Sequence, residues 1–293
     1  MNKVTFIFIK TLITISIVFL VSHSAFSKEL TLTGCSNIKT GFLEKVAQKY
    51  EEKTQVKIIL SGGGSTTGIR KVSEGTSDLG SSSRHSLTDV AGNVQNEEKN
   101  AKLVQIAWDA IVIAVHPNNP VKDITSDTLK KIYDGEIVNW SQLGGPDKRI
   151  ILINQDSTVS GFEHMFRGLI FNNPDYEIKV KSLNVNSSDT LERKIETTET
   201  AIGVTSLSSS KKRTLKLLSF NGIQPTKEAL INLNYSMCMP IYATTNIKTT
   251  PESQAFIDYL LSEDGQKIIS EEGALNIKEG TALEPLLIKL SKC

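Results

Sequence analysis

The part of the chain after its N-terminal segment alternates between strand and helix patterns, and this alternation restricts the fold more than any other feature. Leu30 to Thr33 is a short apolar run typical of a strand, and Val56 to Leu60 alternates and is β-branched. Between them, Phe42 to Glu52 has helical spacing. One face of that expected helix carries Phe42, Val46, Ala47 and Tyr50. A strand, a helix and a strand joined by short links indicate an α/β fold with parallel pairing.

The same pattern continues to the C-terminal region. Strands are expected at 103–107, 111–115, 150–153 and 201–205, and helices at 68–74, 126–133, 161–170, 189–196, 251–261 and 264–272. No repeat, low-complexity tract or Pro-rich linker divides the chain, yet 293 residues exceed one average core. We therefore expect two lobes joined by more than one crossing, at 108–110 and 237–240. The expected lobes are residues 28–109 plus 238–293, and residues 110–237.

Composition excludes several classes of protein. The chain has 33 Lys and Arg against 32 Asp and Glu, so it lacks the basic excess of a nucleic-acid-binding protein. A hydrophobic share of 39% with mixed charges excludes a disordered chain and a polytopic membrane protein. Three cysteines in so long a chain do not make a disulfide scaffold.

The first 27 residues have the pattern of a cleavable secretion signal. Lys3 and Lys10 precede an uncharged apolar run from Thr11 to Phe26, which is shorter than the roughly 20 residues of a membrane span. Small residues near Ser27 predict cleavage after that residue. The mature chain then has 266 residues and a net charge of −1, and lies in the periplasm, where disulfides are permitted.

Two alternatives to simple secretion stay open. The apolar run is also compatible with an uncleaved anchor. Residues 32–35 have the letters of a lipoprotein signal, with Cys35 as the lipid-anchored residue, although Lys28 and Glu29 separate them from the apolar run.

A disulfide between Cys238 and Cys293 is conceivable, and the pairing of the three cysteines is not fixed by the sequence.

Three segments share one design, in which a strand is followed by small polar residues and then a helix. They are residues 33–37, 61–68 and 156–161, and a related serine-rich segment at 80–84 ends a short strand. Unpaired N–H groups and the dipole at a helix start bind anions, and hydroxyl donors reinforce them. Each segment alone is explained as an ordinary helix cap. Together they predict a site for one small anion between the lobes.

Patterns of catalytic chemistry are weaker. The glycine run has the spacing of a nucleotide phosphate loop from Gly63 to Gly68, but Ile69 stands where that loop needs Lys. His85, His116 and His164 show no metal-ligand spacing, and we expect no metal, cofactor or catalytic residue. His164 lies one helical turn after Ser160, so a Ser–His nucleophile is the enzyme alternative, against a solvated or capping histidine.

At this point the motifs resemble a known family, the phosphate-binding proteins (PstS) of phosphate ABC importers, which have the type II periplasmic binding-protein fold. The resemblance runs from about Leu30 to Gly273. It is carried by residues 61–69, 78–84, 132–140 with 143–145, 160–161, 201–203 and 256–266. It implies two lobes, each a mixed sheet flanked by helices, with the ligand in the cleft between them.

The resemblance also implies a set of phosphate-binding residues. The family's hydroxyl donor after the first strand falls at Asn37, its glycine-loop serine at Ser65, and its Asp-x-Gly ligand at Ser83. The expected set is Ser36, Asn37, Ser65, Thr66, Ser83, Arg84, Asp109, Asp156, Ser160, Gly161 and Phe162. Asp109 and Asp156 are the candidates for accepting the proton by which phosphate differs from sulfate, and each is equally well explained as a structural cap.

Two positions depart from the family pattern. The family usually has an Arg shortly before the Ser-Gly pair, where this chain has Asn154, Gln155 and Asp156, and its Thr after that pair is Phe162 here. Losing a charge-assisted contact to the ligand would cost about 1.5–3 kcal/mol, and Arg84 is the candidate that would supply the missing charge.

The expected function is therefore capture of inorganic phosphate and delivery to a membrane ABC permease, by a monomer that closes at a hinge. Three alternatives remain: another oxyanion such as sulfate, molybdate or an organic phosphate; a phosphate sensor or adhesion protein on the same fold; and an exported hydrolase.

Overall fold

The computed structural model describes residues 28–290, with the side chains of residues 288 and 289 left out. The expected secretion signal, its cleavage site and the Cys293 end of the conceivable Cys238–Cys293 disulfide lie outside the described residues. Within residues 28–290, no helix is both long enough and apolar enough to span a membrane.

The core of the fold is one mixed sheet with the strand order β2-β1-β3-β11-β4-β8-β6-β7, in which β9 also pairs with β4. The strands of this sheet are β1 (Lys28–Gly34), β2 (Val56–Ser61), β3 (Leu79–Ser82), β4 (Ala101–Val115), β6 (Ile151–Asn154), β7 (Leu183–Asn184), β8 (Ala201–Ser206), β9 (Lys216–Leu217) and β11 (Cys238–Asn246). Strands β5 (Asp123–Ile124) and β10 (Ser219–Phe220) form a separate parallel pair. Parallel pairing of β1 with β2 and β3, and of β6 with β7 and β8, confirms the predicted α/β class.

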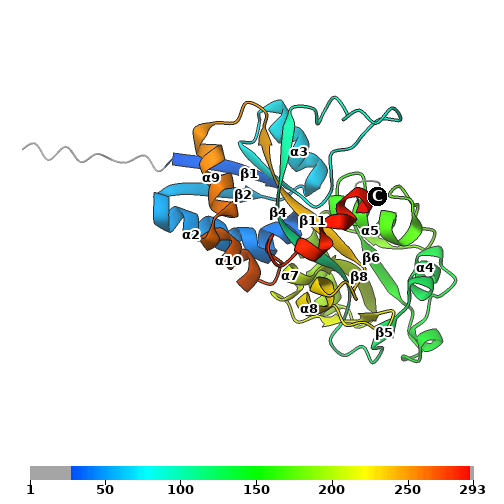
Figure 1. Ribbon diagram of the computed structural model, residues 1–293. Coiled ribbons are helices and arrows are strands. Elements are labelled where there is room, and N and C mark those ends of the chain that lie inside the picture. Colours follow the sequence, from blue (N-terminus) through cyan, green and yellow to red (C-terminus); the bar gives the residue numbers. More distant parts are fainter. Residues whose placement is uncertain (1–27, 291–293) are drawn as a thin grey trace, which may run out of the picture.

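Helices cover the sheet in both lobes (Figure 1). They are α1 (Ser36–Ile38), α2 (Glu44–Thr54), α3 (Gly64–Glu74), α4 (Ser126–Asp134), α5 (Gly161–Phe171), α6 (Ser188–Thr197), α7 (Leu207–Ser210), α8 (Lys227–Ile231), α9 (Pro251–Leu261), α10 (Glu263–Glu271) and α11 (Leu287–Leu290), with the π-helical turn η1 (Lys39–Leu43) and the 3₁₀ turns η2 (Trp140–Leu143) and η3 (Thr281–Leu286). Helices α1, η1 and α2 follow one another without a break, so the helical run begins six residues before its predicted start at Phe42 and ends two residues after its predicted end at Glu52.

The two strands expected at 103–107 and 111–115 are one strand, and this prediction was wrong. Strand β4 pairs antiparallel with β11 in one lobe and with β8 in the other (Figure 1). Its central residues stay extended because Trp108 exchanges both backbone hydrogen bonds with Leu275, and Ala110 lies opposite Cys238 of β11. From Ile106 onward every residue of β4 is buried, as expected for a strand that is covered on both faces.

Helix α3 begins four residues before the predicted start at Gly68. Gly63 and Gly64 have φ values of +132° and +81°, which side-chain-bearing residues rarely adopt. These two glycines turn the chain from β2 directly into the helix, so part of the expected loop is helical. The first turn of α3 therefore lies at the carboxyl end of β2.

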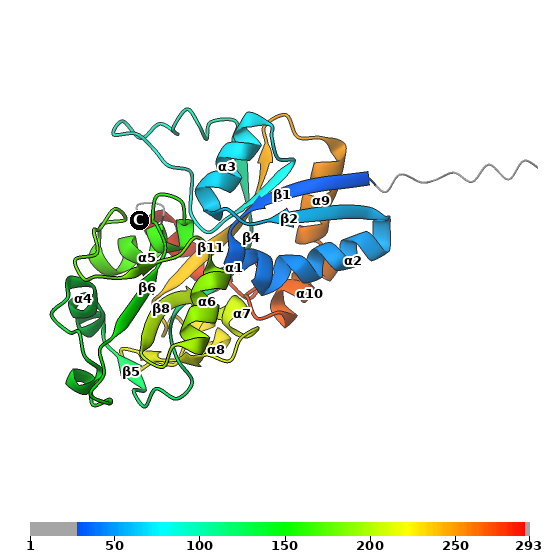
Figure 2. The same ribbon diagram turned by 180° about the vertical axis from the view of Figure 1, so that it is seen from behind.

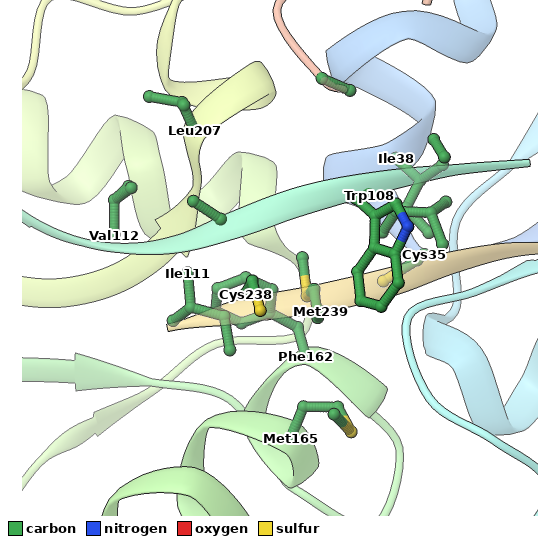
Figure 3. Packing of buried hydrophobic residues seen from close by; sticks show 14 of the residues in the cluster. Cys35, Ile38, Trp108, Ile111, Val112, Phe162, Met165, Leu207, Cys238 and Met239 are labelled. Carbon is green, nitrogen blue, oxygen red and sulfur yellow. The ribbon is translucent and has the colours of Figure 1, made fainter. Parts of the chain in front are cut away.

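The hydrophobic core continues through both lobes along β4 and β11. Figure 3 shows Trp108, Ile111, Cys238 and Met239 packed along these strands. In the first lobe, the predicted apolar face of α2 is buried, and Tyr50 packs edge-to-face on Phe256 of α9 with ring centroids 5.0 Å apart.

Candidate functional site

The two lobes enclose a cavity of about 170 Å³. We call it the interlobe cavity; its lining residues are Cys35, Ser36, Gly64, Gln155, Asp156, Val159, Ser160, Val185, Asn186, Ser187 and Ser188. A water molecule occupies about 30 Å³ in the liquid, so this volume holds roughly five waters or one small ion.

Four helical segments begin at this cavity. Strands β1, β2, β6 and β7 end at Gly34, Ser61, Asn154 and Asn184, and each leads through a short loop into a helix. The α1 run, α3, α5 and α6 start from these loops, around the middle of the molecule in Figure 2. Free N–H groups and the positive ends of the helix dipoles therefore point to one place, which is the arrangement that binds anions.

Side chains of the first lobe form a buried polar cluster beside the cavity. The Cys35 thiol donates to Asn37 Oδ1 (3.1 Å) and lies 3.6 Å from Ser83 Oγ. Ser83 Oγ in turn lies 3.4 Å from Ser65 Oγ, which also accepts a hydrogen bond from Ser83 N (3.1 Å). Asn37 Nδ2 is buried and has no hydrogen-bond partner among the described residues. A buried donor without a partner costs about 1–3 kcal/mol, so this N–H group is a candidate to bind a ligand.

The loop between β6 and α5 forms the wall contributed by the second lobe. Ser160 caps α5 by accepting from Glu163 N (3.3 Å), and its hydroxyl donates to Gln155 Oε1 (2.8 Å). Gln155 Nε2 reaches Ser188 Oγ at the start of α6 (3.3 Å). Gln155 therefore links the N-cap residue of α5 to the first residue of α6, and it lines the cavity.

A buried ion pair supports this loop from behind. Arg167 lies 3.4 Å from Glu163 and donates to the backbone oxygen of Gln155 (3.0 Å) and to Ser157 Oγ (3.1 Å). Burial raises the pKa of Glu163 to about 7, although the Arg167 charge and the Gln155 N–H oppose the shift.

The lobes are in contact, so the conformation is closed. Thr66 donates through its backbone N to Val159 O (3.2 Å) and through its hydroxyl to Thr158 O (2.9 Å). The approach is too close for side chains at two glycines: a Cβ on Gly64 would lie 2.4 Å from Val159 O, and a Cβ on Gly161 would lie 2.4 Å from Ser65 Oγ. These bonds bring together the predicted residues Ser65, Thr66 and Gly161 from opposite lobes.

Arg84 does not offer its charge to the interlobe cavity. Its guanidinium donates to both oxygens of Glu98 (2.6 and 3.1 Å) and to Thr66 Oγ1 (2.9 Å), and both members of this ion pair are buried. Arg84 lines a separate groove of about 770 Å³ on the outer side of the Thr66–Thr158 contact. The expectation that Arg84 replaces a missing ligand charge therefore has no support in the geometry.

Phe162 offers only its backbone to the site. Its side chain is buried in the core beside α5, in the same cluster as Ile111 and Cys238 (Figure 3). The sequence position that would carry a hydroxyl donor in the family pattern thus serves packing here. Asp156 lines the cavity and is exposed, and its Oδ1 accepts from Thr158 N (2.9 Å) and Thr158 Oγ1 (2.7 Å).

Asp109 lies away from the cavity, at the crossing between the lobes. Its carboxylate accepts from the Ser208 hydroxyl, from Ser208 N (3.3 Å) and from Ala110 N (2.8 Å). Burial raises its pKa from 3.8 to about 6, although the Ser208 and Ala110 hydrogen bonds oppose that shift. Asp109 therefore joins β4 to α7 and is not placed to accept a proton from a ligand in the cavity.

The raised pKa of Asp109 predicts a pH-dependent stability. Between pH 3.8 and about 6 the native state binds more protons than the unfolded state, so stability falls as pH rises through this window. The rise of the Asp109 pKa from 3.8 to about 6 corresponds to about 3 kcal/mol. Asp109→Asn should remove this part of the slope, because an amide keeps an acceptor for the backbone donors and the Ser208 hydroxyl rotates to accept. Urea unfolding at a series of pH values measures the slope. Glu163→Gln is the control. Burial also raises the pKa of Glu163, to about 7, so this residue lowers stability with rising pH in a higher pH window. An unchanged dependence of stability on pH between 3.8 and about 6 in Asp109→Asn would contradict the assignment.

The Ser160–His164 alternative finds no support in the geometry. The Ser160 hydroxyl hydrogen is directed at Gln155, and His164 lines the groove that also contains Arg84. Within residues 28–290, no group of three or more His, Cys, Asp or Glu side chains is arranged to hold a metal ion.

Several cavity residues are absent from the predicted set of ligands. Cys35 and Gly64 lie in the recognised segments and Gln155 directly before one, whereas the loop 185–188 was missed altogether. The loop carried a readable signal, because Ser187 caps α6 by accepting from Thr190 N (3.2 Å) and follows a strand, as in the three segments that were recognised. Strand β7 has only two residues, and this shortness hid the pattern.

A two-lobed α/β fold with a small cavity between the lobes, ringed by helix starts, defines a class of binding proteins that close on a ligand. The family model described as the PBP superfamily domain matches residues 21–264. The phosphate-binding protein PstS of Bacillus subtilis is 31% identical over 86% of this chain and 82% of its own length, and that of Borreliella burgdorferi is 30% identical over 86% and 91%. A crystal structure of a candidate phosphate ABC transporter substrate-binding protein from Clostridium perfringens, with bound phosphate, superposes with a TM-score of 0.75 at 30% identity, over 85% of this chain and all of that one. The chain belongs to the PBP superfamily and, within it, to the PstS family of phosphate-binding proteins. The predicted family and fold are thereby confirmed.

Proposed function

We propose that this protein captures inorganic phosphate in the interlobe cavity and delivers it to a membrane ABC permease. The observation that carries the proposal is the meeting of four helix starts at one cavity, next to the buried Asn37 Nδ2, which has no hydrogen-bond partner within residues 28–290. The relatives named above are phosphate-binding proteins, and one is described with phosphate bound.

The proposed ligands come from both lobes. From the first lobe they are Ser36, Asn37, Ser65, Thr66 and Ser83, and from the second lobe Gln155, Asp156, Ser160, Gly161 and the backbone of Phe162. Arg84 and Asp109 are assigned structural roles, because each is held by buried partners outside the cavity lining.

The proposed mechanism is hinge closure between lobes bounded as the sequence predicts, 28–109 with 238–293 and 110–237. Strands β4 and β11 run side by side through this junction, so bending there moves the lobes as units. Closure makes the Thr66 bonds to Thr158 and Val159 and expels water from the cavity. No covalent step is involved. The protein acts outside the cytoplasm, as a monomer, after removal of residues 1–27.

Calorimetric titration of residues 28–293 tests this function. The protein is first unfolded and refolded to remove carried-over ligand, then titrated with phosphate, sulfate and molybdate. Phosphate binding without sulfate heat supports the proposal. Sulfate or molybdate binding without phosphate binding would show that the protein serves another oxyanion. This comparison is needed because the described residues that line the cavity include no Lys, Arg or His. Catalytic release of phosphate from a phosphate ester, measured in a phosphatase assay, would contradict a purely binding role.

Ser160→Ala should weaken phosphate binding by about tenfold or more. The change removes a hydroxyl that lines the cavity and also releases the Gln155 side chain. As a helix cap, Ser160 also contributes to folding, so stability should fall by about 1 kcal/mol. Ser262→Ala is the matched control, because Ser262 caps α10 in the same way, by accepting from Gly265 N (3.3 Å), far from the cavity. Equal affinities in the two variants would show that Ser160 serves only the helix.

Ser65→Ala should also weaken phosphate binding. It leaves the buried Ser83 N–H without its acceptor, so we expect an additional loss of about 1–3 kcal/mol in stability. Calorimetry and urea unfolding on the same preparation separate the two effects, and unchanged affinity would place the phosphate elsewhere.

A further inference from the structure

The Cys35 thiol lies between the interlobe cavity and the buried polar cluster of the first lobe. Cys35 lines the cavity and is itself buried. It is the N-cap residue of α1, whose first turn carries Ser36 and Asn37. The thiol is therefore placed to act on Asn37, a residue that the proposed function assigns to the phosphate site.

The thiol has one hydrogen, and its hydrogen bonds show where that hydrogen points. The sulfur lies 3.1 Å from Asn37 Oδ1 and 3.6 Å from Ser83 Oγ. An amide oxygen can only accept a hydrogen bond, whereas a hydroxyl can also donate one. The thiol hydrogen therefore belongs to Asn37 Oδ1, and the Ser83 hydroxyl is left to donate to the sulfur. Burial raises the pKa of the Cys35 thiol, so the hydrogen stays in place at neutral pH.

This hydrogen bond fixes the orientation of the Asn37 amide. If the amide were turned over, Nδ2 would face the sulfur of a protonated thiol, which is a weak acceptor, and Oδ1 would lose its donor. With Oδ1 held by the thiol, Nδ2 is the group left without a hydrogen-bond partner among the described residues. The asparagine is only 1% exposed, so bulk water does not reach this donor.

The orientation decides what Asn37 offers to an anion. A hydroxyl, which the family pattern has at this position, always carries both a donor and an acceptor on one atom and turns toward an anion by rotation. An asparagine has its donor and its acceptor on different atoms. It stabilises an anion only when its nitrogen faces the ligand, and that requires another group to occupy its oxygen.

We infer that Cys35 is a positioning residue of the phosphate site, whose thiol holds the Asn37 oxygen so that the Asn37 nitrogen donates to the bound anion. Cys35 acts through Asn37 and is not itself a ligand. The inference rests on the proposed function, and it adds to the site a residue that the predicted set of ligands lacks.

Two variants that differ by one hydroxyl group test this role. Cys35→Ser keeps a donor for Asn37 Oδ1 and Cys35→Ala does not, while both remove the sulfur. In calorimetric titration, Cys35→Ser should bind phosphate nearly as tightly as the unmodified protein. Cys35→Ala should bind about tenfold more weakly, which is the value of roughly one net hydrogen bond. Equal phosphate affinities in the two variants would overturn the inference.

Ser77→Ala is the matched control for the loss of a buried donor. Ser77 is a buried residue of the same lobe that donates to Leu79 O (2.8 Å) and to Thr33 Oγ1 (3.2 Å), and it does not line the cavity. Urea unfolding should show a loss of stability in both Ser77→Ala and Cys35→Ala. Phosphate affinity should fall in Cys35→Ala alone, and an equal fall in Ser77→Ala would reduce Cys35 to a packing residue.

The S–H stretching band in Raman spectra tests the direction of the hydrogen bond without any ligand. Subtracting the spectrum of Cys35→Ser isolates the Cys35 band from those of the other two cysteines. The band should lie at the lowered frequency of a donating thiol, and it should rise when the same subtraction is made in an Asn37→Ala background. A band that Asn37→Ala leaves unchanged would show that the thiol does not hold the amide, which overturns the inference.

The outcomes separate this inference from the proposed function. Unmodified protein that binds phosphate, with the same affinity in Cys35→Ser and Cys35→Ala, overturns the role of Cys35 and leaves phosphate capture intact. Folded, unmodified protein that does not bind phosphate overturns the proposed function, and with it this inference.

Discussion

Replacing Arg84 with Leu should lower the free energy of unfolding by about 3–5 kcal/mol, because it leaves the buried Glu98 carboxylate with only the more distant Arg70, whose Nε lies 3.9 Å away. Arg84 donates to both Glu98 oxygens, and the same guanidinium reaches Thr66 Oγ1 and the backbone oxygen of His85. Removing it therefore disturbs the residue that joins the two lobes as well as the ion pair. Urea unfolding measures the loss.

A double-mutant cycle distinguishes this structural role from ligand binding. Arg84→Leu combined with Glu98→Leu removes both charges, and replacing a whole buried pair by apolar residues is often close to neutral. We expect the double variant to recover at least half of the lost stability, although Leu87 N loses its Glu98 acceptor. A single variant of full stability that has lost phosphate affinity would instead return Arg84 to the ligand set predicted from the sequence.

Gly161→Ala should reduce phosphate affinity by roughly a hundredfold, about 3 kcal/mol, while the protein still folds. The added Cβ would lie 2.4 Å from Ser65 Oγ, 2.6 Å from Ser65 Cβ and 2.9 Å from Arg84 Cγ. Real Cβ atoms essentially never approach this closely, so the lobes cannot reach the closed arrangement. Alanine is acceptable in the first turn of a helix, so the open protein should be as stable as before.

Two further variants make this result specific. Gly75→Ala adds a Cβ that meets no atom within 4 Å, so affinity should persist while stability falls by about 1 kcal/mol, because Gly75 has a φ of +77°. Ser65→Gly combined with Gly161→Ala removes the two closest atoms, Ser65 Oγ and Ser65 Cβ, and leaves Arg84 Cγ at 2.9 Å. Small-angle scattering at saturating phosphate should therefore show that part of the compaction returns. Unaltered phosphate affinity in Gly161→Ala would mean that binding does not need this contact between the lobes.

The amino-acid sequence by itself determined the α/β class, most of the helices and the position of the loops that form the site. Helix α9 was predicted with its observed bounds, since Thr250 caps it and Pro251 begins it, and such signals are local. The loops at 33–37, 61–68 and 156–161 were recognised for the same reason: small polar residues and glycines before a helix have one local meaning wherever the strands lie.

Only the tertiary structure decided what the charged residues do. Arg84 and Glu98 are fourteen positions apart with an irregular segment between them, and no periodicity predicts that they pair. Asp109 reaches Ser208 across 99 positions of sequence, and Gln155 reaches Ser188 across 33. The energy of a charge depends on burial and on partners brought together by the fold, so local pattern identified the loops of the site, and long-range packing determined its charge.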